Sequence, residues 1–102
     1  MARATIIHFS KFFAKHKYFE TEAVVELKIW SIPVSKSFPE GIKYALFCVN
    51  KEFNEIVVGF DNHHPKGHHM HIGSEESEYS FESVDRLIKD FFDMMITQGY
   101  EL

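Results

Sequence analysis

The sequence predicts an α+β fold: an antiparallel sheet of about five strands with a C-terminal amphipathic helix packed on one face. Two hydrophobic periods support this prediction. In short segments between residues 22 and 73, apolar residues alternate with polar ones, as in half-buried strands. After residue 83, apolar residues recur every three or four positions, as on one face of a helix. The 102 residues suit one domain with a single core, so we assign residues 1–102 to one domain.

Strands are expected where the alternation is clearest. Segments 22–32, 55–62 and 68–73 each carry apolar side chains at every second position. Segment 43–50 is apolar on both faces, which indicates a central strand. Residues 33–41 contain two prolines and a glycine, and therefore predict a loop before that central strand.

The two ends of the chain differ in how clearly they predict structure. Residues 5–7 indicate a short strand, while 9–16 fit either a helical turn or the extension of a hairpin into the next strand. At the other end, Ser83 is a suitable N-cap and Gly99 a suitable stop signal. We expect a helix of about 15 residues between them.

Composition indicates a soluble cytoplasmic protein. No apolar run approaches the roughly 20 residues needed to cross a bilayer, and the first residues lack a secretory pattern. The single cysteine, Cys48, rules out an internal disulfide and fits a reducing compartment. Because it lies in an apolar run, we expect Cys48 to be a small buried hydrophobic residue.

The net charge of −4 argues against a strongly basic nucleic-acid binder, but the charges are unevenly distributed. Residues 1–17 carry four basic side chains and no acid. Residues 73–102 carry eight acids against two basic side chains. One surface can therefore attract an anion while the acidic end faces water or a basic partner.

Five of the seven histidines fall between His63 and His71. Imidazole is the only side chain that ordinarily changes charge between pH 5 and 8, so this density points to proton transfer, metal binding or phosphate handling. The cluster is internal and interrupted, unlike a purification tag. His63, His64 and His68 fall in a predicted turn, where solvent-facing positions are expected.

The parity of the strands predicts a shared polar face. If the apolar positions point at the C-terminal helix, the alternate positions lie together on the opposite side of the sheet. His69 and His71 would then have their imidazoles on one side, about 6–7 Å apart. That separation suits an acid/base pair or two metal ligands. The predicted polar face comprises Glu26, Lys28, Trp30, Asp61, His69 and His71.

Plainer interpretations of the polar residues stay open. Asp61-Asn62 is a common turn former, and a lysine such as Lys66 often serves only solubility. A structural zinc site needs four ligands and the chain has no cysteine pair, so we assign no metal site and no cofactor. A catalytic metal site made of two histidines with Asp61 or Glu26 remains an alternative.

Five segments carry recognisable motifs: Val25-Glu26-Leu27-Lys28-Ile29-Trp30, Gly41 to Leu46, Val58 to Asn62, Lys66 to Gly73, and Tyr79 to Phe91. Taken in order, they resemble the TumE-type toxins of prokaryotic toxin–antitoxin systems. The resemblance covers about residues 20–92, and the Asp-Asn and Lys-Gly-His-His-Met-His-Ile-Gly segments are its specific part. The N-terminal stretch 9–19 and the inserted His63-His64-Pro65 depart from the family pattern.

The resemblance implies a toxin that acts on RNA and is encoded beside a DNA-binding antitoxin. Our first hypothesis is a metal-independent endoribonuclease, with His69 and His71 as base and acid and Asp61 orienting a histidine. Lys66 and Lys43 would contact the phosphate. The substrate-binding candidates are Glu26, Lys28, Trp30, Lys43, Tyr44 and Asn62.

Two other functions remain open: a metal-dependent nuclease or hydrolase, and a non-catalytic binding module. The expected partners are the cognate antitoxin and an RNA substrate. A homodimer is compatible with the sequence, and no membrane partner is expected.

Overall fold

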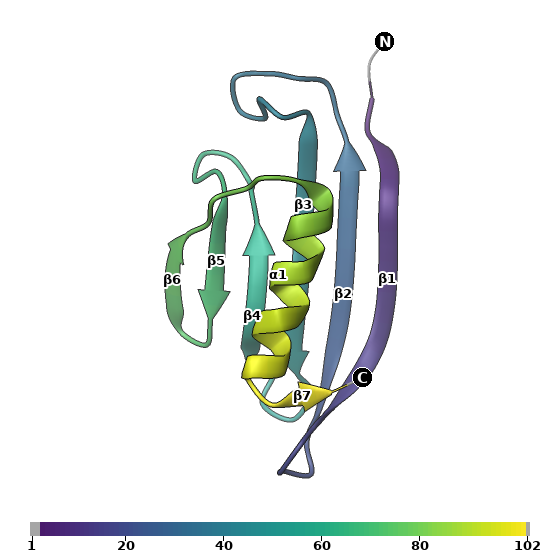
Figure 1. Cartoon of the computed structure of the whole chain (residues 1–102), viewed down its shortest axis with the longest axis vertical. Helices are drawn as coiled ribbons and strands as arrows, with labels where there is room; N and C mark the ends of the chain where they lie inside the picture. The colour runs from purple at the N-terminus through teal and green to yellow at the C-terminus, as the bar shows by residue number, and fades with distance from the viewer. Residues whose placement is uncertain (1–2, 102) are drawn as a thin grey trace.

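The computed structural model describes residues 3–101 as one curled antiparallel sheet of seven strands with one helix, which confirms the predicted α+β class. The strands run along the length of the molecule, and the helix lies on one face of the sheet, nearly parallel to the strands (Figure 1). The elements are β1 (Thr5–His16), β2 (Glu22–Ser31), β3 (Ile42–Asn50), β4 (Ile56–Asp61), β5 (His69–Ile72), β6 (Glu75–Glu78), α1 (Val84–Thr97) and β7 (Tyr100–Glu101).

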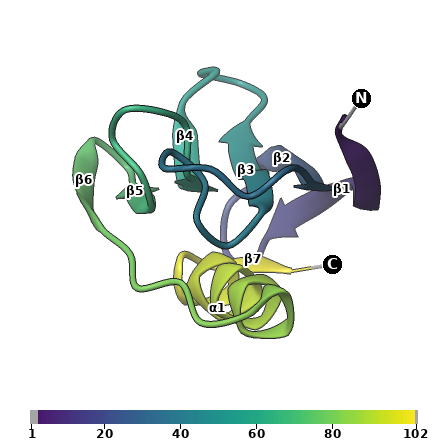
Figure 2. The same cartoon turned by 90° about the horizontal axis from the view of Figure 1, so that it is seen from above.

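The strands are ordered β6-β5-β4-β3-β2-β1-β7, and every neighbouring pair is antiparallel. The helix α1 lies on one side of this sheet only, as the view from above shows (Figure 2). We call the side away from α1 the open face. The two faces therefore have different environments, and alternate residues of each strand are divided between them.

The core lies between the sheet and α1, as the sequence periods predicted. On β2 the alternate residues Val25, Leu27 and Ile29 are at most 1% exposed. The helix presents Leu87, Phe91 and Met95, all fully buried, to the same layer. Ser83 caps α1 by accepting a hydrogen bond from the Arg86 backbone amide at 3.1 Å. The helix therefore begins where its N-cap was predicted.

The N-terminal segment is one long strand, so the helical-turn alternative for residues 9–16 is wrong. β1 pairs with β2 in register from Lys15↔Glu22 to Thr5↔Ser31, with one irregularity between Ile6 and His8. The physical reason is the alternation of side chains along β1: Ala14 is buried toward the helix, while Phe9 and Phe13 are more than half exposed.

The sheet contains two strands more than the predicted five. β6 forms a hairpin with β5 across Gly73-Ser74, where Gly73 has a φ of +60°. A two-residue loop that starts with glycine is a strong hairpin signal, but the acidic β6 has no alternation that would predict a strand. β7 pairs with the end of β1 after Gly99. A strand of two residues, such as β7, is too short to show a periodic pattern in the sequence.

The structure also bears on two further expectations, the burial of Cys48 and the lack of a membrane-spanning segment. Cys48 is 0% exposed in the core, as predicted. The helix α1 is too short and too polar to cross a membrane, and the described part of the chain holds no other helix.

Candidate functional site

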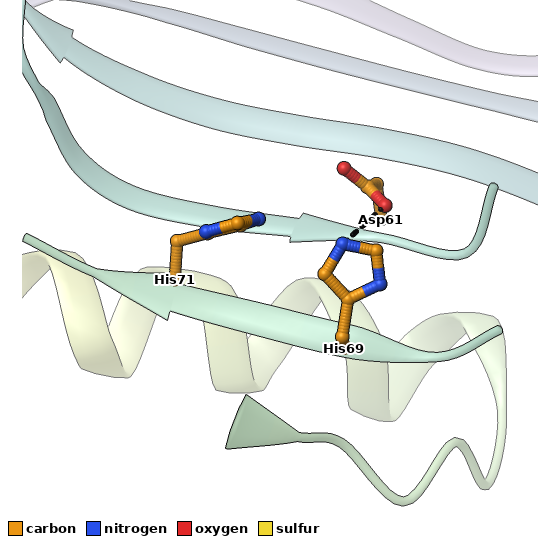
Figure 3. A group of neighbouring side chains, drawn as sticks. All are labelled: Asp61, His69 and His71. Atoms are coloured by element: carbon orange, nitrogen blue, oxygen red, sulfur yellow. Dashed lines mark ion pairs between the residues drawn. The ribbon is translucent and has the colours of Figure 1, made fainter. Parts of the chain in front are cut away.

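Three side chains on the open face form a compact cluster that we call the Asp–His centre: Asp61 from β4 with His69 and His71 from β5. Asp61 pairs directly with His69 in the antiparallel register, and His71 lies two residues further along β5. All three side chains point toward one another on the open face (Figure 3). Their ligand-type atoms lie within 4.8 Å of one another. The two imidazole centroids are 5.1 Å apart, closer than predicted.

The two ring nitrogens of His69 have different surroundings. Nδ1 lies 2.8 Å from the backbone carbonyl oxygen of Gly67. A carbonyl only accepts hydrogen bonds, so Nδ1 carries the proton. Nε2 lies 2.9 Å from Asp61 Oδ1. This distance is short enough for an ion pair, but the angles do not make a hydrogen bond, so Nε2 is a buried nitrogen with no hydrogen-bond partner in residues 3–101.

A third histidine, His63, also contacts the Asp–His centre. Its Nδ1 lies 2.8 Å from Asp61 Oδ1, and its ring packs edge-on against His69 with centroids 5.0 Å apart. The side chain of His63 is 53% exposed, so much of its ring is accessible to solvent. Sequence reasoning expected His63 only to face solvent. The turn between β4 and β5 folds His63 back over Asp61, and no periodic pattern predicts that path.

Lys66 and His71 are linked through an acid that the sequence did not single out. The ammonium of Lys66 forms an ion pair with Glu76 Oε1, and Glu76 Oε2 lies 3.7 Å from His71 Nδ1. The hydrogen bond from Lys66 holds the pKa of Glu76 below its usual value. Lys66 therefore lies beside the Asp–His centre with its charge partly neutralised by Glu76.

The ring of Phe47 packs closely over Gly59, next to His71 on the open face. A Cβ atom on Gly59 would lie 2.5 Å from Phe47 Cε1, so only glycine leaves room for this ring. The Phe47 ring lies 6.5 Å from the His71 ring, centroid to centroid. Glycine inside a strand commonly marks such a close approach, and this signal could have identified Phe47 as a neighbour of the centre.

Other residues predicted to contact the substrate also lie on the open face, one or two strands away from Asp61 on β4. Lys28, Ala45 and Asp61 lie in one cross-strand row, so a small alanine side chain separates Lys28 from the Asp–His centre. The carboxylate of Glu26 pairs with Lys28 at 3.0 Å and with Lys11 at 3.9 Å. Trp30 and Lys43 face each other in the next row. The parity prediction for Glu26, Lys28 and Trp30 is confirmed.

Two residues predicted to contact the substrate, Tyr44 and Asn62, are buried instead of exposed on the open face. Tyr44 is 1% exposed on the helix side, where it stacks on Phe81 and its hydroxyl lies 2.9 Å from His68 Nδ1. Burial raises the pKa of Tyr44 far above its usual value, so the hydroxyl stays neutral. Asn62 is 2% exposed and bonds the backbone of β3, accepting from Tyr44 and donating to Ile42. Both residues hold the fold together near the centre.

The open-face arrangement can serve two kinds of chemistry. Three imidazoles around one carboxylate can transfer protons, because the carboxylate fixes ring orientation and stabilises imidazolium. Two imidazoles and a carboxylate also form a ligand set for a divalent metal ion. Asp61, His69 and His71 are the residues that could hold such an ion.

Comparison with known families identifies the class of protein as the toxin of a toxin–antitoxin pair. A family model described as Toxin TumE matches residues 2–98. The chain therefore belongs to the TumE toxin family, and the match includes the N-terminal strand as well as the histidine segment. A TumE toxin implies a cognate antitoxin as its partner. No curated protein and no solved structure matched the chain.

Proposed function

We propose that this TumE-family toxin cleaves RNA on the open face of the sheet, with the Asp–His centre as its catalytic centre. The observation that carries the proposal is the pair of imidazoles, His69 and His71, beside Asp61 on the face opposite α1. Cleavage of RNA by its own 2′-hydroxyl needs an acceptor for that proton, stabilisation of the phosphorane charge and a proton donor to the 5′-oxygen.

The two histidines differ in solvent exposure, and we assign them different roles on that basis. The side chain of His71 is 22% exposed and that of His69 is 5% exposed. When the centre works with protein side chains alone, His71 exchanges a proton with the RNA. His69 and Asp61 then act behind it, by orienting the rings and stabilising imidazolium. His63 is a second accessible imidazole, because Asp61 holds its Nδ1 and leaves Nε2 free.

The surrounding open face favours a single-stranded nucleic acid despite the net charge of −4. Lys28 and Lys43 can meet phosphates, and Glu26 is already paired with Lys28 and Lys11. Trp30 and Phe47 lie on the same face and can stack on bases, which is how proteins commonly hold unpaired RNA. The local charge near the centre, rather than the overall charge, decides this contact.

The test compares His71→Ala with His8→Ala, a histidine on the far strand β1. Purified proteins are incubated with single-stranded RNA, and the cleavage products are resolved by electrophoresis. We expect His71→Ala to lower the cleavage rate by about 10² or more, as is usual for loss of a proton-transfer group. His8→Ala should retain the wild-type rate.

Expression in bacteria provides the second measurement. Wild type should arrest growth with loss of RNA, and the folded His69→Ala/His71→Ala double variant should not. Arrest that persists in the double variant, with intact RNA in both cultures, would instead favour a binding module without catalysis.

A further inference from the structure

We propose that the Asp–His centre binds one divalent transition-metal ion through Asp61 Oδ1, His69 Nε2 and a ring nitrogen of His71. The place of this ion in RNA cleavage rests on the proposed function. Its binding does not, and it can be measured in the absence of RNA. The inference departs from the sequence-based expectation of no metal, because the structure reveals how His69 is held.

The buried nitrogen of His69 is the first observation. With Nδ1 donating to Gly67, a neutral His69 leaves Nε2 unprotonated, only 2.9 Å from the carboxylate oxygen of Asp61. Two electron-rich atoms at this distance repel each other unless a cation lies between them. His69 is 4% exposed, so water cannot relieve the contact freely. A metal ion satisfies both atoms at once.

The chemistry and spacing of the donors are the second observation. Metal–ligand bonds of about 2.0–2.2 Å place neighbouring ligands of a tetrahedral ion roughly 3.3–3.6 Å apart. The Asp61–His69 separation of 2.9 Å needs a small widening, and the three donors lie within 4.8 Å. The side chain of His71 is 22% exposed, and a change in its rotamer would bring its ring nitrogen closer to the other two donors. Two imidazoles and one carboxylate suit zinc, manganese or iron and leave open positions for a substrate.

The groups around the centre are arranged as an outer shell. Metal-binding histidines usually donate their other N–H to a carbonyl or carboxylate, which fixes the tautomer. The Gly67 carbonyl does this for His69, and His63 bonds Asp61 at 2.8 Å. The Glu76 carboxylate lies 3.7 Å from His71 Nδ1. With the ion bound, His71 serves as a ligand and His63 remains the accessible imidazole for proton transfer.

The test is titration of metal-free protein with zinc, followed by calorimetry, and with cobalt, followed by its visible absorption. Wild type should bind one ion per chain. His71→Ala and the isosteric Asp61→Asn should weaken binding at least tenfold and abolish the cobalt band, since even loss of an outer partner costs about 10- to 100-fold. His64→Ala is the matched control from the same turn, because His64 contacts Ser37 rather than Asp61, and it should bind normally. Circular dichroism verifies that each variant is folded.

Two results would overturn the site. One is the absence of one-to-one binding to wild type, which leaves a second proton on His69 as the group that satisfies Asp61. The other is equal weakening by His64→Ala and His71→Ala, which indicates chelation by the turn. RNA cleavage at the full rate after chelation overturns the role of the ion while the proposed function stands. One-to-one binding in a protein that cleaves no RNA supports the site and overturns the proposed function.

Discussion

The carbonyl oxygen of Gly67 and Nδ1 of His69 lie 2.8 Å apart, and this hydrogen bond decides which ring nitrogen of His69 faces Asp61. Gly67 has a φ of +73°, a conformation that suits glycine and lets the turn direct its carbonyl back to the ring. The tautomer of His69 is therefore set by the backbone of the turn before β5, and the centre is oriented before any ligand arrives.

The His69→Asn variant separates the structural role of His69 from its role in the centre. The amide nitrogen of asparagine can stand where Nδ1 stands and keep the bond to Gly67, while Nε2 is lost. We expect a folded protein whose RNA cleavage falls by about 10². His69→Leu should also leave the Gly67 carbonyl unpaired and lose a further 1–3 kcal/mol or so of unfolding free energy. Urea denaturation and the RNA assay, run on both variants, check this. Wild-type activity in His69→Asn would contradict it.

Gly59→Ala should destabilise the protein through a clash on the open face. The added methyl group would lie 2.5 Å from Phe47 Cε1, and overpacking of this kind costs roughly 1–3 kcal/mol of unfolding free energy. Displacement of the Phe47 ring should also disturb His71 and lower RNA cleavage. Phe47→Ala in the same chain removes the clash, so urea denaturation of the single and double variants should give a favourable coupling energy. Additive losses would contradict this explanation.

Asp90 should contribute stability that is lost in acid. Burial opposes its ionisation, but hydrogen bonds from Tyr79 at 2.6 Å and Arg86 at 2.9 Å outweigh burial and hold the pKa of Asp90 below its usual value. A lowered pKa in the folded state stabilises the protein above about pH 4, the pKa of an unfolded aspartate, and this stability disappears as the pH falls through the folded value.

Asp90→Asn is therefore expected to lower the unfolding free energy at pH 7 and to reduce its dependence on pH between 3 and 5. Urea denaturation at several pH values measures both effects. Asp93→Asn is the matched control, because Asp93 pairs only with Lys89 on the exposed side of the helix. An equal effect of the two substitutions would exclude the Tyr79–Asp90–Arg86 network as the cause.

Cys48 should report unfolding. Burial raises the pKa of its thiol to about 12, and the side chain is 0% exposed. The reactive thiolate is therefore almost absent at pH 8, and reagents cannot reach the sulfur in the folded state. Labelling by a disulfide reagent should be slow in buffer and should follow the unfolding transition in urea. Rapid labelling of folded protein would show that β3 opens locally.

The sequence predicted the faces of the sheet well where strands alternate. Side chains two apart on a strand must share a face, so His69 and His71 could be placed together without knowledge of the fold. The same rule failed to place Tyr44, because segment 43–50 is apolar on both sides and gives no parity. Tyr44 faces the helix, so a residue expected to contact substrate lies in the core.

The rest of the centre depends on contacts that cross loops and strand edges. His63 reaches Asp61 through the path of a turn, and Glu76 reaches His71 through pairing of an acidic edge strand. No periodic pattern in the sequence signals either contact. The tautomer of His69 likewise follows from a single backbone carbonyl, which is visible only in three dimensions.

The placement of α1 on a single side of the sheet has an evolutionary consequence. Residues that face the helix are constrained by packing against it, whereas open-face positions away from the Asp–His centre and the Phe47–Gly59 contact are free of that constraint. Under the proposed function, substitutions at Lys28, Trp30 or Lys43 are therefore expected to change target preference at little cost to folding. Related toxins could diverge rapidly at these positions while keeping the same interior.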